Sequence, residues 1–281
     1  MAHATAVQKE THHSPVIDYQ NHAAVRQIRA LQSREERDRT GLFIIEGIKF
    51  LSAAVRHAAA IETLVIAPHL LVNPFGQKLV RFLRRSGVPT LDVVDEVFHR
   101  VSLGEERQGV IATVRQRIDR LSRTSIKQES CWVAMESVRS PGNLGTILRT
   151  GDAVGASGLI LLGHGVDPYE PGCVRASMGS LFAQRIVRTR AQEIDAWKRR
   201  HGVILVGTSP SARHDYREVD YRRPVVFFVG PERQGLSEDQ QASCDVMVRI
   251  PMVGSADSLN LSIATSLMLY EWFRQRRPVE G

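Results

Sequence analysis

The sequence is poor in cysteine and has no long apolar run. Its three cysteines, Cys131, Cys173 and Cys244, are widely separated and make no C-x-x-C pair. This spacing argues against a zinc site or a disulfide framework and fits a reducing compartment. The longest apolar runs, such as 225–229, have the length of a strand, whereas a membrane helix needs roughly 20 apolar residues. We therefore expect a cytoplasmic protein with neither a membrane partner nor a metal.

Motifs for several common chemistries are also missing. No G-x-x-x-x-G-K-[ST] sequence occurs, and no G-x-G-x-x-G follows a strand, which disfavours a nucleotide site that cradles phosphates. The ten histidines are scattered without an H-E-x-x-H spacing, and no G-x-S-x-G marks a hydrolase nucleophile. The function must therefore be sought in other patterns.

Positive charge is unevenly distributed along the chain. Residues 1–128 hold 19 Lys and Arg residues against 13 Asp and Glu residues, whereas the remaining residues hold 18 against 17. A basic half joined to a nearly neutral half suggests that the first half binds a polyanion. A solvated basic surface explains the charge equally well, so the pattern alone leaves both interpretations open.

The first half alternates between helical and strand patterns. We expect helices over 20–39, 48–60, 74–86 and 95–101, and strands over 42–47, 61–67, 90–94 and 109–114. This alternation predicts a small α/β domain over 20–114, after a flexible tail at 1–19. Residues 115–128 are polar and basic without a core pattern, and we interpret them as a linker.

The second half predicts another α/β domain, over 129–281, with a mostly parallel sheet. We expect strands over 131–137, 158–163, 185–189, 203–208, 225–229 and 246–250, and helices over 143–154, 172–180 and 258–276. Parallel sheets bind ligands at the carboxyl ends of their strands. Three segments at such ends, 137–158, 228–237 and 249–272, combine glycines with polar side chains, which predicts one composite site.

These three segments carry a specific resemblance. NLGTILRTGDAVGASGLIL, VGPERQGLS and RIPMVGSADSLNLSIA resemble, in order, the three signature motifs of the SpoU branch of the SPOUT methyltransferases, and RASMGSLF resembles a segment between the first two. The match spans about 131–275. Segments 43–55 and 101–114 are similar to the ribosomal-protein-like RNA-binding domain that precedes the catalytic domain in many such enzymes. Pro231 departs from the family, which usually has Asn there, and we interpret it as a change in turn rigidity.

The resemblance implies a trefoil-knotted catalytic domain that binds S-adenosylmethionine, forms a homodimer and methylates a ribose 2′-hydroxyl in RNA, most plausibly 23S ribosomal RNA. It implies cofactor contacts at Gly230, Ile250, Met252 and Leu259. The residues that match the family's catalytic and substrate-positioning residues are Asn143, Arg149, Glu232, Ser258 and Asn260.

Several of these residues have a structural alternative. Asn143 could cap the helix that follows it, and Ser258 could cap the last helix as well as serve the site. Asn260, inside the first turn of that helix, is poorly explained by capping, so we favour a functional role. Glu232 could hydrogen-bond backbone amides in its turn or orient Arg149.

The substrate and the role of Arg175 stay open at this stage. Arg175 is either an RNA phosphate contact or part of a structural ion pair. A tRNA substrate and a catalytically inactive RNA-binding dimer are the alternatives to ribosomal RNA methylation. Housekeeping and antibiotic-resistance enzymes share these motifs, so the sequence does not separate those two roles.

Overall fold

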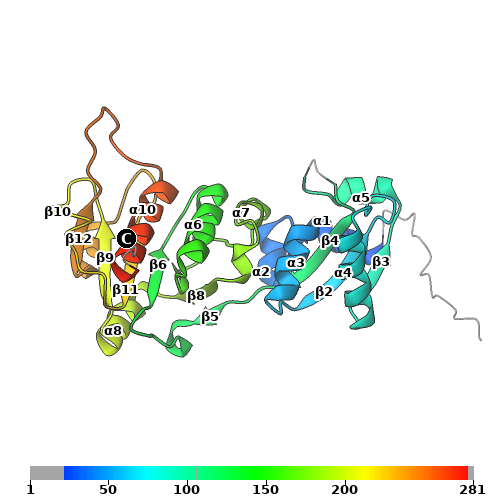
Figure 1. The fold of residues 1–281 in the computed structure, drawn as a ribbon, viewed down its shortest axis with the longest axis horizontal. Coiled ribbons are helices and arrows are strands. Elements are labelled where there is room, and N and C mark those ends of the chain that lie inside the picture. Colours follow the sequence, from blue (N-terminus) through cyan, green and yellow to red (C-terminus); the bar gives the residue numbers. More distant parts are fainter. Residues whose placement is uncertain (1–21, 105–106, 278–281) are drawn as a thin grey trace, which may run out of the picture.

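The computed structural model describes residues 22–104 and 107–277, which form two α/β domains side by side (Figure 1). The tail expected at 1–19 lies outside the described residues. Within the described ranges, no helix combines the length and the apolar character needed to cross a membrane.

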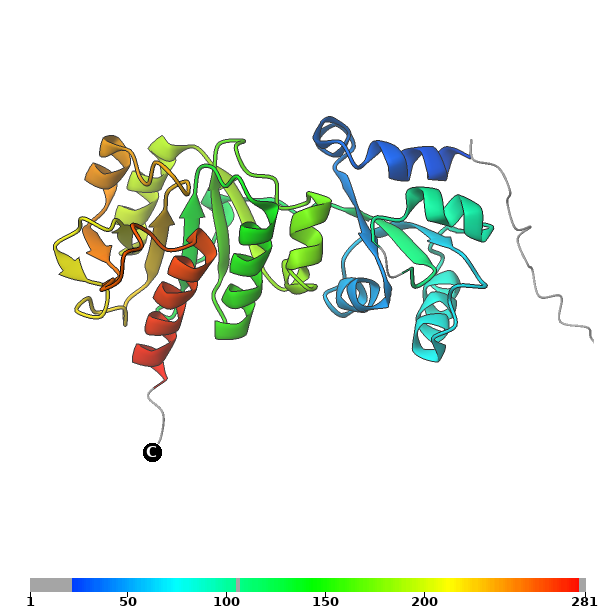
Figure 2. The same ribbon diagram turned by 90° about the horizontal axis from the view of Figure 1, so that it is seen from above.

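The N-terminal domain is a four-stranded sheet with helices on both faces (Figure 2). The strands, in the order β1-β4-β2-β3, are β1 (Leu42–Glu46), β2 (Ile61–Ile66), β3 (Thr90–Asp92) and β4 (Val110–Arg115). Only the β2–β3 pair is parallel. The helices are α1 (Ala23–Ala30), α2 (Arg34–Thr40), α3 (Ile48–Arg56), α4 (Pro74–Arg85) and α5 (Asp95–Val101). Alternate residues of β1 point to opposite layers: Ile44 belongs to the buried cluster with α1 and α5, and Phe43 to the cluster that includes α3 and α4.

The single helix expected over 20–39 is wrong. The first helix ends at Ala30. Ser33 caps the next helix by accepting a hydrogen bond from the Glu36 amide at 3.2 Å. Arg37 stabilises the turn between the two helices, because its Nη1 donates to the Leu31 and Gln32 carbonyls at 2.8 Å each. These carbonyls would otherwise lack helical partners.

The C-terminal domain contains an eight-stranded sheet in the order β10-β12-β9-β11-β6-β7-β8-β5, and every pair of neighbours is parallel. This confirms the expected parallel sheet. Its strands are β5 (Asp119–Arg120), β6 (Cys131–Met135), β7 (Gly158–Leu162), β8 (Arg185–Thr189), β9 (Ile204–Thr208), β10 (His214–Asp215), β11 (Val225–Val229) and β12 (Val246–Arg249). Strands such as β11 are buried along their whole length because helices cover both faces.

The helices of this domain are α6 (Pro141–Val154), α7 (Pro171–Ala176), α8 (Ala191–His201), α9 (Glu238–Ser243) and α10 (Leu261–Arg276). Figure 2 shows α6 and α10 side by side on one face of the sheet, with α8 and α9 on the other. Helices α8 and α9 and strand β10 were not among the expected elements. The segment interpreted as a linker contributes β5 to the edge of the sheet and buries Leu121.

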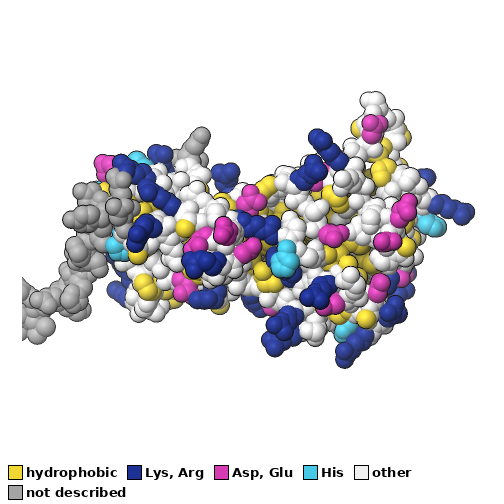
Figure 3. All heavy atoms as spheres, turned by 180° about the vertical axis from the view of Figure 1, so that it is seen from behind, with side chains coloured by type: hydrophobic (Ala, Val, Ile, Leu, Met, Phe, Trp, Pro, Cys, Tyr) yellow, Lys and Arg dark blue, Asp and Glu magenta, His cyan; other side chains and the backbone are white. Residues whose placement is uncertain are grey.

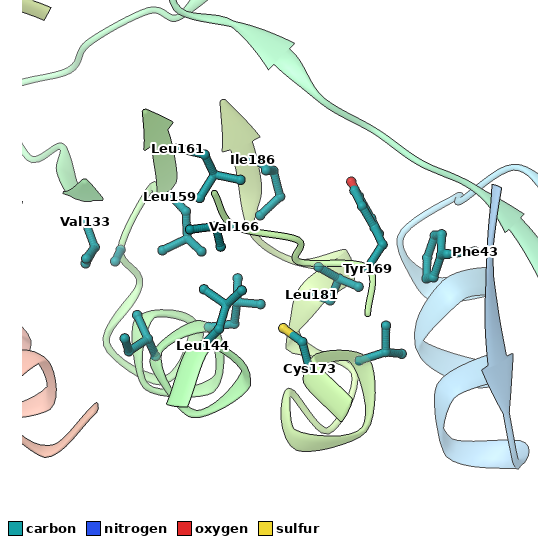
Figure 4. Packing of buried hydrophobic residues seen from close by; sticks show 14 of the residues in the cluster. Phe43, Val133, Leu144, Leu159, Leu161, Val166, Tyr169, Cys173, Leu181 and Ile186 are labelled. Atoms are coloured by element: carbon teal, nitrogen blue, oxygen red, sulfur yellow. The ribbon is translucent and has the colours of Figure 1, made fainter. Parts of the chain in front are cut away.

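The two domains meet through the segment after β7. The ring of Tyr169 lies against Phe43 of β1, with 4.7 Å between ring centroids (Figure 4). The Tyr169 hydroxyl donates to the Arg117 carbonyl at 2.6 Å and accepts from the Arg117 amide at 2.9 Å. One buried aromatic side chain thus holds both a strand of the N-terminal domain and the segment that connects the domains.

Candidate functional site

The site lies where the strand order of the parallel sheet reverses. After β6 the chain continues to β7 and β8 on one side, whereas the other neighbour of β6 is β11, which lies next to β9. Val229 at the end of β11 pairs with Met135 at the end of β6. The loops that follow these two strands therefore leave the sheet together, in the crevice where such sheets bind ligands.

Helix α6 begins in this crevice. Ser140 is its N-cap and accepts a hydrogen bond from the Asn143 amide at 3.3 Å, and Pro141 occupies the first helical position. Asn143 is inside the first turn, so the interpretation of Asn143 as the capping residue is wrong. Its side chain is available for other contacts.

The Glu232 carboxylate binds this first turn of α6. Its Oε1 accepts from Asn143 Nδ2 at 3.0 Å, and its Oε2 accepts from the Arg139 amide at 3.4 Å. Partial burial alone would raise the pKa of Glu232, but hydrogen bonds from backbone amides and from Asn143 outweigh it and lower the pKa below its ordinary value. Glu232 is therefore an ionised group that orients its neighbours, and it is poorly suited to take up a proton.

Glu232 is placed by a tight turn between residues 230 and 235. The Gly235 amide donates to the Pro231 carbonyl at 2.9 Å, which closes the turn. A Cβ atom on Gly230 would lie 2.1 Å from the Gly235 carbonyl carbon, so only glycine fits at position 230. Pro231 lies in this turn, and its expected effect on turn rigidity stays a prediction.

Asn260 joins the third loop to this cluster. Its Oδ1 accepts from the Ser262 and Ile263 amides and caps α10, while its Nδ2 donates to Asn143 Oδ1 at 3.1 Å. We expected that Asn260 would not be a cap, and this expectation is wrong. The expected start of the helix at Ser258 is also wrong. Asn260 both caps the helix and contacts Asn143.

Three predicted residues from three distant segments thus form one hydrogen-bonded chain, Glu232–Asn143–Asn260. Arg149 and Ser258 do not belong to it. Both are exposed, and neither makes a side-chain hydrogen bond or ion pair with the residues that the structure describes. Arg149 follows Asn143 by six residues, about 9 Å along α6. Within one chain, Glu232 binds backbone amides and does not orient Arg149.

The loop between β12 and α10 has the surface that a cofactor needs. It extends away from the sheet (Figure 1), and no hydrogen bond among the described residues involves positions 250–259. Ile250 and Met252 are half-buried, and Leu259 is 37% exposed. Apolar side chains beside free backbone amides and carbonyls fit a molecule with an adenine ring and polar ends, such as S-adenosylmethionine.

Arg175 lies apart from this cluster, exposed on α7. No carboxylate of the described residues lies within 4.0 Å of it, so the ion pair considered from the sequence is not formed. Sequence reasoning missed the cap at Ser140, although a Ser-Pro pair before a helix is a recognised start signal. It also missed the hydrogen bond between Thr150 and Ser266, 3.0 Å long, which joins α6 to α10.

Two family models match the chain. Residues 130–270 match the model of the SpoU rRNA methylase family, and residues 22–112 match the model of the MRM3-like substrate binding domain. The 23S rRNA (uridine(2479)-2′-O)-methyltransferase of Streptomyces viridochromogenes is 36% identical over 256 residues, which cover 88% of this chain and 87% of the relative.

Two solved structures share the fold across both domains. The AdoMet-bound rRNA methyltransferase from Sinorhizobium meliloti superposes with a TM-score of 0.85 at 36% identity, over 93% of this chain and 98% of that one. The SpoU methyltransferase AviRb from Streptomyces viridochromogenes, in complex with AdoMet, gives 0.83 at 34% identity, over 92% and 99%.

Proposed function

Since the chain belongs to the SpoU rRNA methylase family, we propose that it transfers a methyl group from S-adenosylmethionine to a ribose 2′-hydroxyl of 23S ribosomal RNA. The observation that carries this proposal is the chain Glu232–Asn143–Asn260, because it assembles the three loops into one polar centre beside a loop suited to the cofactor. The choice of 23S RNA is supported by the 36% identical relative, which bears that activity in its name.

When bound, S-adenosylmethionine supplies a methyl group that is already activated on a sulfonium. The protein must then hold the ribose hydroxyl in line, and such alignment can supply roughly 7–11 kcal/mol. The amide of Asn143 has a fixed orientation, since its Nδ2 donates to Glu232 and its Oδ1 accepts from Asn260. Its Nδ2 keeps a second N–H, and this donor positions the acceptor ribose.

Arg149 acts on the charge that develops on the hydroxyl oxygen. A guanidinium with a pKa above about 12 does not release its proton, so Arg149 is not the general base. It stabilises the developing alkoxide and clamps the adjacent phosphate, while the proton leaves through phosphate or water. Within its own chain, Arg149 does not contact the cluster of Glu232, Asn143 and Asn260. In this role it must therefore act in the site of another chain.

A homodimer would place Arg149 of one chain in the site of the other. Ile263, Leu267 and Tyr270 of α10 are 51%, 37% and 53% exposed, and their spacing places them on one face of the helix. Helix α6, which carries Arg149, lies beside α10. A second copy of the chain covers this apolar face and receives Arg149 in its own site. Arg175 contributes a phosphate contact.

We assign RNA recognition to the domain over 20–114 and catalysis to 129–281, whose chain forms the trefoil knot that the resemblance implies. The protein acts in the cytoplasm, together with its ribosomal RNA substrate.

The test is methyl transfer from radiolabelled S-adenosylmethionine to unmodified total ribosomal RNA and to tRNA. We expect label in 23S RNA that survives alkaline hydrolysis as a dinucleotide, because a 2′-O-methyl group blocks cleavage at that ribose. Asn143→Ala should abolish the label and still bind the cofactor. Label in tRNA alone would keep the chemistry and overturn the substrate. Absence of both methyl transfer and cofactor binding would favour the inactive RNA-binding dimer.

A further inference from the structure

Two hollows lie at the boundary between the domains, and a third adjoins them on the N-terminal domain. An outer hollow of about 490 Å³ lies between α3 and α4, and its lining includes Lys49, Arg56 and Phe75. A central hollow of about 800 Å³ lies between the domains, lined by Lys49 on one side and Arg175 on the other. An inner hollow of about 480 Å³ is lined by Ser140 and other residues at the start of α6.

Neighbouring hollows share lining residues, so the three lie in a row, which we call the path. Lys49 and Gln108 line both the outer and the central hollow. Pro171 and Gly172 of α7 line both the central and the inner hollow. The path therefore starts on the N-terminal domain, crosses the domain boundary and ends at the first turn of α6, which carries Asn143.

Several exposed cations along this path are not neutralised, whereas Arg34 and Arg37 of the inner hollow pair with Asp38 and Asp167. Lys49, Arg56 and Arg175 are exposed, and none of them forms an ion pair with a carboxylate of the described residues. Lys and Arg side chains also lie on both domains on the face opposite α3 and α4, which is the face that Figure 3 shows. Free cations spaced along a concave path match a phosphodiester backbone, and they would repel a basic protein partner.

Two apolar side chains lie among these cations. Phe75 is 55% exposed at the start of α4 and lines the outer hollow. Met178 is 39% exposed and has a positive φ of 54°, a conformation that non-glycine residues rarely adopt. An exposed ring stacks on a base only where that base is unpaired, and the hollows have the volume of nucleotide-sized pockets.

We propose that the three hollows form one groove that binds a single-stranded segment of the substrate RNA and leads it to Asn143. Phe75 stacks on a base, Met178 packs against the strand at the domain boundary, and Lys49, Arg56 and Arg175 bind phosphates. This inference rests on the proposed function and adds to it the form of RNA that is recognised and the residues that recognise it.

The experiment measures binding of the full-length protein to a fluorescein-labelled, non-self-complementary RNA 12-mer by anisotropy. Phe75→Ala should weaken binding about fivefold or more, as expected for the loss of one stacked base. Phe82→Ala is the matched control, because Phe82 lies on the same helix with the same 55% exposure and does not line the three hollows. It should bind like the wild type.

The phosphate contacts have a separate readout. Replacing Lys49, Arg56 and Arg175 by Gln together should reduce the slope of log Kd against log salt by about 2, at about 0.7 per phosphate contact on a single strand. Lys78→Gln, an exposed lysine of α4 outside the three hollows, should leave the slope unchanged. Phe75→Ala should raise the KM for ribosomal RNA with little change in kcat.

Equal binding by the Phe75→Ala and Phe82→Ala proteins would overturn the groove, as would tighter binding of a hairpin duplex than of the single strand. Those results leave methyl transfer by the wild type untouched. Failure of the proposed function has a different signature: no methyl transfer to any RNA while the 12-mer still binds with the Phe75 dependence.

Discussion

Arg37 and Asp167 form a buried ion pair across the boundary between the two domains, with Arg37 Nη2 and Asp167 Oδ2 2.6 Å apart. Their side chains are 3% and 10% exposed, so both charges are shielded from water. The same guanidinium holds the carbonyls at the turn between α1 and α2. The Arg37 side chain therefore stabilises both the turn between α1 and α2 and the contact between the two domains.

Removing one partner of this pair should destabilise the protein strongly. Asp167→Asn keeps the side-chain volume and leaves Arg37 buried without a counter-charge, which typically costs about 3–5 kcal/mol. We expect a loss of this size in the free energy of unfolding, measured by urea denaturation. Arg39→Gln breaks the exposed pair with Glu36 and should have little effect. Equal losses in the two variants would show that the buried pair does not secure the domain contact.

The pH dependence of stability should report on Glu232. Its pKa lies below the ordinary value of 4.5, so folding favours the ionised form. This stabilisation is present above about pH 4.5 and is lost as the pH falls through the folded-state pKa. The difference in unfolding free energy between the wild type and Glu232→Gln should be constant from pH 7 to about 5 and should shrink below 4.5.

Glu129→Gln is the control for this experiment, because Glu129 is exposed and makes no ion pair with the described residues. It shows how much of the change comes from removing any surface carboxylate. A difference that stays constant through the acid range would mean that the hydrogen bonds to Glu232 do not favour its charge.

The parallel sheet could be predicted from the sequence because its strands are buried on both faces. Runs such as 225–229 are continuously apolar, and helical stretches with Gly or Pro boundaries separate them. The site could be located because parallel strands place their carboxyl ends at one edge. The trefoil knot stays a prediction, since strand order alone does not determine how the chain threads.

The errors arise where a local signal had several interpretations. The segment 20–39 is apolar at helical spacing, but Ser33 followed by Glu36 is also a helix start, and the buried contacts of Arg37 decide between them. Before α10, Ser258 and Asn260 are both good caps. The hydrogen bonds that Asn260 Oδ1 accepts from the Ser262 and Ile263 amides identify Asn260 as the cap.

The proposed dimer predicts a change in mass from a single substitution. Tyr270→Asp places a charge on the exposed face of α10, where a partner would have to bury it. We expect the wild type to have about twice the chain mass of 31.4 kDa by light scattering, and the variant to approach the chain mass. Phe82→Asp introduces the same charge at a similarly exposed aromatic residue on α4 and should not change the mass. A monomeric wild type would overturn the dimer.

Arg149 should affect the rate of methyl transfer and not the affinity for the cofactor, because its side chain lies outside the hydrogen-bonded cluster. Arg149→Lys should lower kcat at least about tenfold, since lysine lacks the bidentate fork. Arg199→Lys, on the opposite face of the sheet, is the control. An unchanged rate in Arg149→Lys would remove Arg149 from the chemistry.

Mixed dimers decide whether Arg149 serves its own site or that of the partner. If it serves the partner, a dimer of one Asn143→Ala chain and one Arg149→Ala chain holds one complete site, because the intact Asn143 of one chain meets the intact Arg149 of the other. Random mixing of two inactive proteins in a two-fold dimer should then restore about one quarter of wild-type activity. If Arg149 acts within its own chain, every site in the mixture lacks one group and no activity returns.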